Sequence, residues 1–332
     1  MTTERTLLQE RLTSIIRRFA QRRILVIGDA IADQFIYGAI SRVSREAPVF
    51  ILRHEHTETT PGGAANCAMN LAALGASVAL VSLVGEDEPG RALLERLKVA
   101  GVDCSGMIRS SAIQTTTKVR ILGGQAHSTR QQVIRIDYDN PPLSDFRLRR
   151  MLQERADEKA AAAHAIIISD YNYGVAAEDI AAALRDSAAV PVLVDSRFQL
   201  ANYPGFTSAT PNEEEVETLV GNAVDEADLA TVAESLRLKL GLRALLVTRG
   251  SHGMMLLEDG VEPLCLEAVG AREPVDVTGA GDTVIATYAL ALAAEASFPD
   301  AARLANYAGG LVVMKRGTAT VSAEELAESV LR

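Results

Sequence analysis

Apolar runs alternate with segments of helical spacing along most of the chain. Continuous apolar runs predict buried strands at 24–28, 77–84, 165–170, 191–195 and 244–248. Ala- and Leu-rich segments with suitable start and stop residues predict helices at 61–75, 87–100, 141–163, 178–188, 283–294 and 299–316. This alternation of strand and helix predicts a doubly wound α/β sheet.

Two segments follow a different pattern. In 115–139, TKVRIL and QVIRID alternate polar with apolar residues, which predicts a two-stranded antiparallel ribbon with one solvated face. Residues 35–58 mix apolar and polar positions with turn signals and predict short, partly exposed strands. His54 and His56 would point the same way there, and two histidines without a third ligand favour a solvated face over a metal site. We expect one domain over residues 1–332, with a small β lid formed by about 35–60 and 113–139.

The composition of the chain excludes several classes of function. The 332 residues are 48% hydrophobic and 23% charged, which is typical of a globular protein with a sizeable core. A net charge of −10 without a basic run argues against an extended nucleic-acid surface. Residues 1–23 resemble an amphipathic surface helix rather than a signal peptide, and no apolar run approaches the roughly 20 residues that span a bilayer. The three cysteines, Cys67, Cys104 and Cys265, lack metal or disulfide spacing. We expect a cytoplasmic protein without nucleic-acid or membrane partners.

The strongest chemical candidate is the glycine turn Thr278-Gly279-Ala280-Gly281-Asp282, which precedes the apolar helix. A helix N-terminus presents unpaired N–H groups and positive dipole charge, and glycines let an anion approach them. Asp282 adds a possible base, and its position should favour the charged carboxylate. An anion cradle beside a base suits phosphoryl transfer to a hydroxyl. For this motif alone, an ordinary Gly-x-Gly turn before a helix is an equal alternative.

Other candidates follow predicted strands or open helices. Asp29 and Asp33 lie at the carboxyl end of the first strand, where ligands bind in open α/β sheets, or they cap a turn. Gly62 and Gly63 permit close backbone approach and Asn66 can donate and accept hydrogen bonds, unless this is an ordinary glycine-initiated helix.

Two further motifs concern a nucleotide and its metal. Asn212 and Glu215 share a helix face and would hold hydrated Mg²⁺, although the same spacing forms a capping box, which is favoured on this motif alone. The glycine-rich turn 249–253 after a strand is a plausible nucleotide wall. On the ribbon, Lys118, Arg120 and Arg135 either confer solubility or form an anion-binding flap.

Together the motifs resemble the ribokinase-like (PfkB) carbohydrate kinases. GGAAN at 62–66 and DVTGAGDT at 276–283 are similar to the two family signatures, and TPNEEE at 210–215 and VTRGSHG at 247–253 extend the resemblance over nearly the whole chain. Within the family, the chain most resembles the D-glycero-β-D-manno-heptose-7-phosphate kinases, through VIGDAIAD at 26–33, ISRVSREAPV at 40–49 and QQVIRIDYD at 131–139.

The resemblance implies a three-layer α/β/α fold with a mainly parallel sheet and a β lid often used for dimerisation. It implies ATP and Mg²⁺, with K⁺ in some members. Asp282 would be the base, the N–H groups of Gly279, Ala280 and Gly281 the anion hole, and Asn212 and Glu215 would act on Mg²⁺ through water. Residues bordering ATP would be Asp195, Asn212, Thr248, Arg249, Gly250, Gly253 and Asn306. Residues holding the sugar would be Asp29, Asp33, Gly62, Gly63 and Asn66, with Arg42, Lys118, Arg120 and Arg135 as candidates for its phosphate.

Three positions depart from the subgroup. Tyr173 replaces a usual lysine, Arg197 stands where lysine is usual and keeps a cation, and Arg45 replaces a common proline. We expect an ATP-dependent sugar kinase, with heptose 7-phosphate converted to heptose 1,7-bisphosphate as the preferred reaction. The alternatives are a kinase of an unphosphorylated sugar or nucleoside, and a non-catalytic sugar-binding protein of the same fold. A nicotinamide-dependent dehydrogenase is disfavoured, because GDAIAD and GAGDTV lack the G-x-G-x-x-G pattern.

Overall fold

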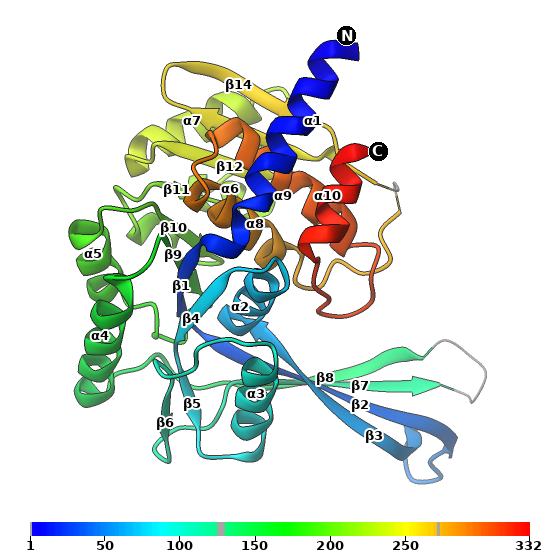
Figure 1. The fold of residues 1–332 in the computed structure, drawn as a ribbon. Helices are drawn as coiled ribbons and strands as arrows, with labels where there is room; N and C mark the ends of the chain where they lie inside the picture. Colours follow the sequence, from blue (N-terminus) through cyan, green and yellow to red (C-terminus); the bar gives the residue numbers. More distant parts are fainter. Residues whose placement is uncertain (1, 125–129, 271–272) are drawn as a thin grey trace.

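A mostly parallel sheet runs through the body of the protein, with helices on both of its faces (Figure 1). The structure, a computed structural model, describes residues 2–124, 130–270 and 273–332. In spatial order the sheet contains β14 (Val261–Leu266), β13 (Met254–Glu258), β12 (Ala244–Thr248), β11 (Ser208–Ala209), β10 (Val192–Ser196), β9 (Ala165–Asp170), β1 (Arg23–Gly28) and β4 (Ser77–Val81). Only the pairings of β13 with β12 and β14 are antiparallel within it. The predicted α/β class and mainly parallel sheet are confirmed.

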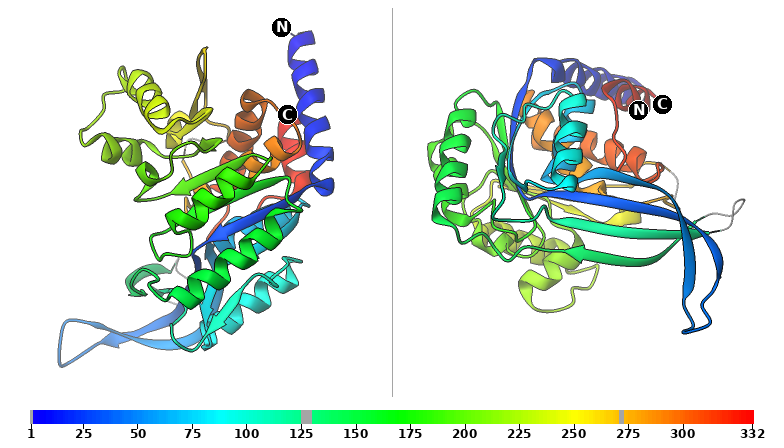
Figure 2. Two further views of the ribbon diagram at one scale, coloured as in Figure 1. Left: turned by 90° about the vertical axis from the view of Figure 1, so that its left-hand side faces the viewer. Right: turned by 90° about the horizontal axis from the view of Figure 1, so that it is seen from below.

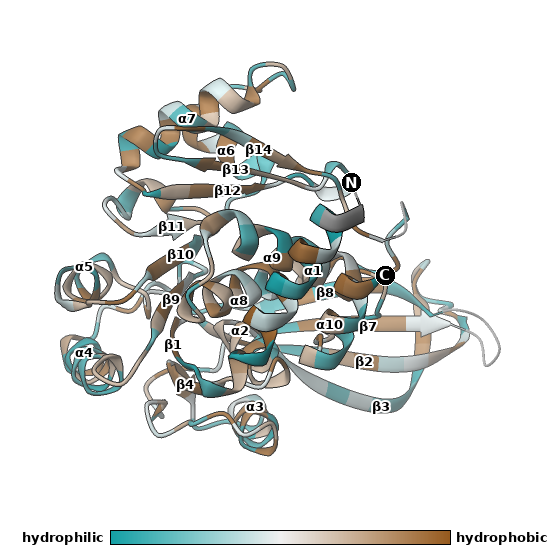
Figure 3. Ribbon diagram, turned by 45° about the horizontal axis from the view of Figure 1, so that its top comes forward, coloured by the Kyte–Doolittle hydropathy of each residue, from teal (hydrophilic) through white to brown (hydrophobic). Residues whose placement is uncertain are grey.

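The continuous apolar strands arise because both faces of the sheet are covered. In β1, Ile24 and Val26 belong to the core on one face, and Leu25 and Ile27 to the core on the other. Figure 3 shows strands such as β9 and β10 in hydrophobic shades. The first core includes side chains of α1 (Thr2–Arg17), α2 (Ala64–Ala73), α3 (Glu88–Val99), α8 (Ala280–Ala293), α9 (Phe298–Val312) and α10 (Ala323–Leu331). The second includes side chains of α4 (Phe146–Ala160), α5 (Glu178–Ser187), α6 (Glu213–Val220) and α7 (Leu229–Leu240). Within the described ranges, no helix is both long and apolar enough to cross a bilayer.

The lid is a second sheet that projects from the body (Figure 2). Its strand order is β3 (Phe50–Gly63), β2 (Ala30–Val43), β7 (Thr117–Gly124) and β8 (Gln131–Tyr138). The predicted antiparallel ribbon is confirmed as β7 and β8, while 125–129 between them lies outside the described residues. The strands predicted as short within 35–58 are in fact longer, because β2 and β3 pair along their whole length from Ala30–Gly63 to Val43–Phe50.

One predicted strand proved to be two. Residues 77–84 divide into β4 and β5 (Leu83–Gly85), and β5 pairs with β6 (Ile108–Ser110) in a separate small sheet. Between them, the Ser82 hydroxyl donates to the carbonyl of Gly28 at 2.6 Å and accepts from the N–H of Ala30 at 3.0 Å. This buried side chain holds the point where β1 ends and β2 begins. Helix α7 and strands β6 and β14 have no counterpart among the elements predicted from the sequence.

The predicted N-terminal helix is confirmed as α1, which lies beside α10 so that the two ends of the chain are close (Figure 1). Leu12, Ile15 and Ile16 are buried on its inner side. Its outer side carries charge, and Arg11 forms a two-bond ion pair with Asp300 at 2.7 and 2.9 Å.

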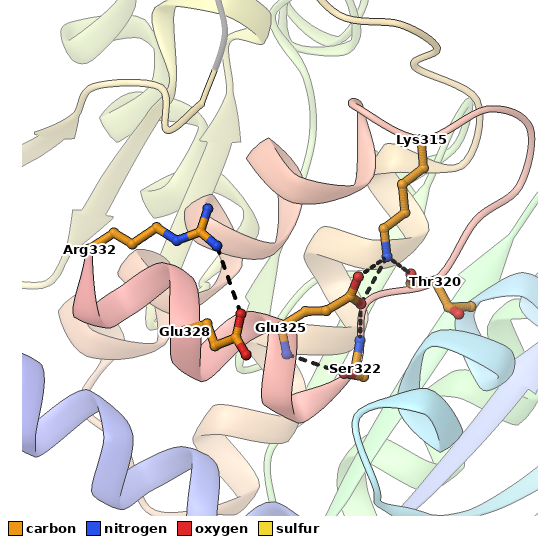
Figure 4. A network of polar contacts seen from close by, with 6 residues as sticks. All are labelled: Lys315, Thr320, Ser322, Glu325, Glu328 and Arg332. Carbon is orange, nitrogen blue, oxygen red and sulfur yellow. Dashed lines mark hydrogen bonds and ion pairs between the residues drawn. The ribbon is translucent and has the colours of Figure 1, made fainter.

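A polar network fixes the start of α10 (Figure 4). The Ser322 hydroxyl and the Glu325 carboxylate form a capping box. The Lys315 ammonium group donates to both Glu325 oxygens, at 2.7 and 2.8 Å, and to the Thr320 carbonyl at 2.7 Å. These contacts therefore join the start of the last helix to the segment that follows α9.

Candidate active site

The glycine turn before α8 delivers Asp282 into the interior. Gly279 has a φ of 76°, a left-handed conformation that favours glycine, and a Cβ there would lie 2.4 Å from the amide nitrogen of Asn66. In the described part of the chain, the N–H groups of Gly279 and Gly281 have no protein acceptor, whereas that of Ala280 donates to the Val277 carbonyl at 3.2 Å. Two of the three predicted anion-hole donors are therefore available to a ligand.

Two donors from distant parts of the sequence meet the Asp282 carboxylate. Asn66, near the start of α2, donates from Nδ2 to Oδ2 at 2.7 Å. Tyr171, directly after β9, donates from its hydroxyl to Oδ1 at 3.1 Å. The lid strand β3 ends at Gly63 and leads straight into α2, so the helix that carries Asn66 continues directly from the lid.

Burial determines the electrostatics of this carboxylate. Asp282 is only 4% exposed, and desolvation raises its pKa to about 7. The hydrogen bonds from Asn66 and Tyr171 and the charge of Lys118 oppose this rise, while the charge of Asp33 adds to it. The sequence-based expectation that the helix N-terminus would favour the charged form is wrong in direction, because the loss of water outweighs the favourable dipole.

Asp282 and the turn line a cavity of about 630 Å³. Lid residues Asp33, Lys118 and Arg120 border the same space, and so does Thr248 at the end of β12. The predicted site residues found on its wall are Asp33, Gly62, Gly63, Lys118, Arg120, Asp195, Asn212, Glu215, Thr248, Gly279, Ala280, Gly281 and Asp282. The structure thus brings together residues from both predicted signatures.

A more apolar cavity of about 400 Å³ adjoins the first and shares the turn with it. The predicted nucleotide residues Gly250, Gly253 and Asn306 line this second space. Asn306 also donates to the Glu267 carbonyl at 2.7 Å, which holds the end of β14 beside α9. An apolar slot beside exposed amides suits a ligand with a flat base and an anionic tail.

Comparison with known proteins identifies the family of the chain. Residues 21–326 match the pfkB family carbohydrate kinases. The chain belongs to this family. Membership supports the predicted enzyme class, a phosphotransferase with an alcohol group as acceptor.

Relatives and solved structures extend the match. The chain is 44% identical over 318 residues to the bifunctional protein HldE of Pseudomonas aeruginosa (strain LESB58) and equally so to that of Alcanivorax borkumensis. These alignments cover 95% of this chain and 65% of each relative. The fold is similar to Arabidopsis thaliana ribokinase complexed with ribose and ATP (TM-score 0.73, 22% identity, 93% of this chain and 98% of that chain). It is also similar to Escherichia coli phosphofructokinase-2 in complex with substrates and products (TM-score 0.76, 20% identity, 93% and 98%).

One part of the larger cavity is lined by Asn212, Glu215 and Asp195. Asn212 and Glu215 form the capping box that was the favoured alternative, with bonds of 2.8 and 3.0 Å, and they also face the cavity. Burial, together with the charges of Asp282 and Glu215, raises the pKa of Asp195 well above its usual range. Asp195, Asn212 and Glu215 line the same cavity, and carboxylate and amide oxygens are ligands that suit a hydrated Mg²⁺. Across the described residues, no three His, Cys, Asp or Glu side chains are close enough to hold a metal ion together.

Asp29 lies outside the cavity, although it was predicted to hold the sugar. Its buried carboxylate accepts from the N–H groups of Tyr171, Tyr173 and Val175 at 2.8, 3.1 and 3.0 Å. Burial raises the pKa of Asp29 to about 6 against the effect of these three donors. Its contacts show a role in holding the loop after β9.

Three predicted cations are also placed elsewhere or are paired. Arg42 lies on an exposed part of β2 opposite Ile51, away from the cavity wall. Arg135 is bonded twice to its neighbour Asp137, at 2.8 and 2.9 Å. The Arg249 side chain is held by Glu213 and Glu226, each at 2.9 Å, beside a different cavity.

Tyr171 is the contact residue that sequence reasoning missed. Its signal was its position directly after an apolar strand that ends in an acid, at the sheet edge where ligands bind. Nothing in the sequence indicates that its hydroxyl reaches a carboxylate 111 residues further along the chain.

The raised pKa of Asp282 predicts a stability change that depends on pH. The pKa of Asp282 rises from 3.8 to about 7 on folding, so the folded state binds the proton more tightly than the unfolded state. The folded state therefore loses stability as the pH increases from about 4 to about 7. We expect Asp282→Asn to raise the thermal unfolding midpoint at pH 8 and to raise it less at pH 5. Asp225→Asn, at an exposed site, is the matched control and should give the same small effect at both pH values. A variant that is less stable than the wild type at pH 8 would contradict the burial argument.

Proposed function

We propose that this chain transfers the γ-phosphoryl group of ATP to a hydroxyl of a phosphorylated sugar. The preferred substrate is heptose 7-phosphate, which would become heptose 1,7-bisphosphate. The observation that carries the proposal is the shared cavity, in which the Asp282 carboxylate lies with the free N–H groups of Gly279 and Gly281. The resemblance to the heptose kinases supplies the identity of the sugar.

In the proposed reaction, each part of the site has one role. Asp282 accepts the proton of the attacking hydroxyl, and the turn amides stabilise negative charge on the transferred group. The apolar slot takes the adenine ring, with Thr248 between it and the larger cavity. Asn212 and Glu215 would hold Mg²⁺ through water, and the ion would offset charge on the ATP phosphates. The proposal also includes a K⁺ ion near the glycine turn, because a structure of E. coli phosphofructokinase-2 in complex with potassium is known.

The substrate phosphate is assigned to Lys118 and Arg197. Both line the main cavity and an adjoining space of about 430 Å³, and neither has a carboxylate partner among the described residues. Arg120, by contrast, is paired with Asp33. Burial and the nearby charge of Arg197 lower the pKa of Lys118, and the charge of Asp33 opposes this change. An unphosphorylated sugar or nucleoside would leave this site unused.

We propose that the protein acts in the cytoplasm. Its partner would be a small-molecule sugar or sugar phosphate and not a nucleic acid. Within the described residues the three cysteines are unpaired, which suits a reducing compartment. The net charge of −10 disfavours polyanions as partners.

A panel of sugars and sugar phosphates with ATP tests the reaction. We expect ATP consumption with heptose 7-phosphate and much less with unphosphorylated sugars and nucleosides. Asp282→Asn should keep the fold and lose about 10²–10⁴-fold in turnover, the usual scale for a general base. Wild-type turnover in that variant would refute the assignment, and no ATP consumption with any acceptor would favour a non-catalytic sugar-binding protein.

Alanine variants test the phosphate site. Lys118→Ala and Arg197→Ala should each raise the Michaelis constant for the phosphorylated sugar by about tenfold or more, the equivalent of one charge-assisted hydrogen bond. The Michaelis constant for ATP should change far less. Arg53→Ala, on the exposed part of β3, is the control. If the two variants and the control gave the same constant, the phosphate would bind elsewhere.

The lid supplies the proposed dimer contact. β8 is an edge strand, and Val133, Ile134 and Ile136 on it are 45%, 52% and 40% exposed. An uncovered apolar edge strand favours pairing with another chain. Sedimentation of the wild type should show a dimer, and Ile134→Asp should shift it to monomer at the same concentration. A wild-type monomer at micromolar concentration would contradict this contact.

A further inference from the structure

Tyr171 touches the proposed base without being part of the reaction described above. Its hydroxyl donates to Asp282 Oδ1 at 3.1 Å, while Asn66 donates to Oδ2 at 2.7 Å. Each carboxylate oxygen therefore has one fixed donor and one remaining lone pair. Two donors of this kind restrict rotation of the carboxylate plane and leave the remaining lone pairs for an incoming hydroxyl.

The backbone of Tyr171 is held just as firmly. Asp29 Oδ2 accepts from the N–H groups of Tyr171 and Tyr173, and Oδ1 accepts from that of Val175. Asp29 is 2% exposed, so moving the loop would leave a buried carboxylate without donors. The end of β1 thus fixes the position from which the Tyr171 hydroxyl reaches α8.

We propose that Tyr171 is a positioning residue, which orients the Asp282 carboxylate and favours its ionised form, and that Asp29 serves this role by anchoring the Tyr171 backbone. A donor to a carboxylate stabilises the anion relative to the acid. The inference rests on the proposed function only in taking Asp282 as the base.

The other charged groups around Asp282 affect its ionisation in opposite directions. Asp33 on β2 and Asp195 on β10 disfavour its charge, and Lys118 on β7 favours it. Cys67 on α2 is buried nearby, and burial raises its pKa, so the thiol stays neutral. Burial and the charge of Asp282 likewise raise the pKa of Tyr171 well above its usual range, which keeps the phenol protonated as a donor.

The test measures the ionisation of Asp282 directly, without a substrate. The carboxyl ¹³C resonance of Asp282, identified by its loss in Asp282→Asn, is followed against pH in the wild type and in Tyr171→Phe. Loss of one hydrogen bond to a charged group should raise the titration midpoint by about one pH unit. The acid limb of the kcat/KM profile should shift by the same amount, with about tenfold lower kcat/KM below the midpoint and recovery at high pH. An unchanged midpoint would overturn the inference.

Tyr203→Phe is the matched control. It removes another buried hydroxyl, which donates to the Ala176 carbonyl at 2.7 Å and lies off the cavity wall. This variant should lower the thermal unfolding midpoint and leave the Asp282 titration unchanged. An equal shift in both variants would indicate general loosening and would also overturn the inference. If Tyr171→Phe moves the midpoint while Asp282→Asn keeps wild-type turnover, the ionisation effect holds and the proposed role of Asp282 as base fails.

Discussion

A carboxylate buried at the start of an apolar helix is the constraint on which the site depends. Withdrawing such a group from water is unfavourable unless donors surround it. Asn66 and Tyr171 supply one donor each to Asp282, yet burial still raises its pKa to about 7. The outcome is a group that exchanges its proton near neutral pH, which is the property that general-base chemistry uses.

The two donors to Asp282 lie in segments that are connected to the lid. Asn66 lies in the first turn of α2, which continues directly from the lid strand β3. Tyr171 is anchored by Asp29 at the end of β1, and Ser82 links the end of β1 to the start of β2. The lid is therefore connected to the Asp282 carboxylate in two ways. One connection runs from β3 through α2 to Asn66, and the other runs from β2 through Asp29 to Tyr171.

The charges at the cavity differ from what the net charge of the chain would suggest. The chain carries a net charge of −10, which disfavours anionic ligands at long range. At the cavity, Arg120 is neutralised by Asp33, while Lys118 and Arg197 have no carboxylate partner among the described residues. Neutralised cations contribute to structure, and unpaired ones remain available to a ligand. This distinction separates Lys118 from Arg120, which looked alike as cations of one predicted ribbon.

The sequence by itself determined the fold class, the buried strands and helices, and the glycine turn, because periodicity and turn chemistry are local properties that neighbouring residues encode. It also indicated Asp282, Asn66 and the motifs at 210–215 and 247–253, which carry the family resemblance. It did not separate 77–84 into two strands or give the length of β2 and β3, since those depend on pairing partners far along the chain. Only the tertiary structure decided that Asp29 holds a loop, that Arg42 and Arg249 point elsewhere, and that Tyr171 meets Asp282. It also reversed the expected pKa shift of Asp282, because desolvation is set by everything that packs around a group and not by its neighbours in sequence.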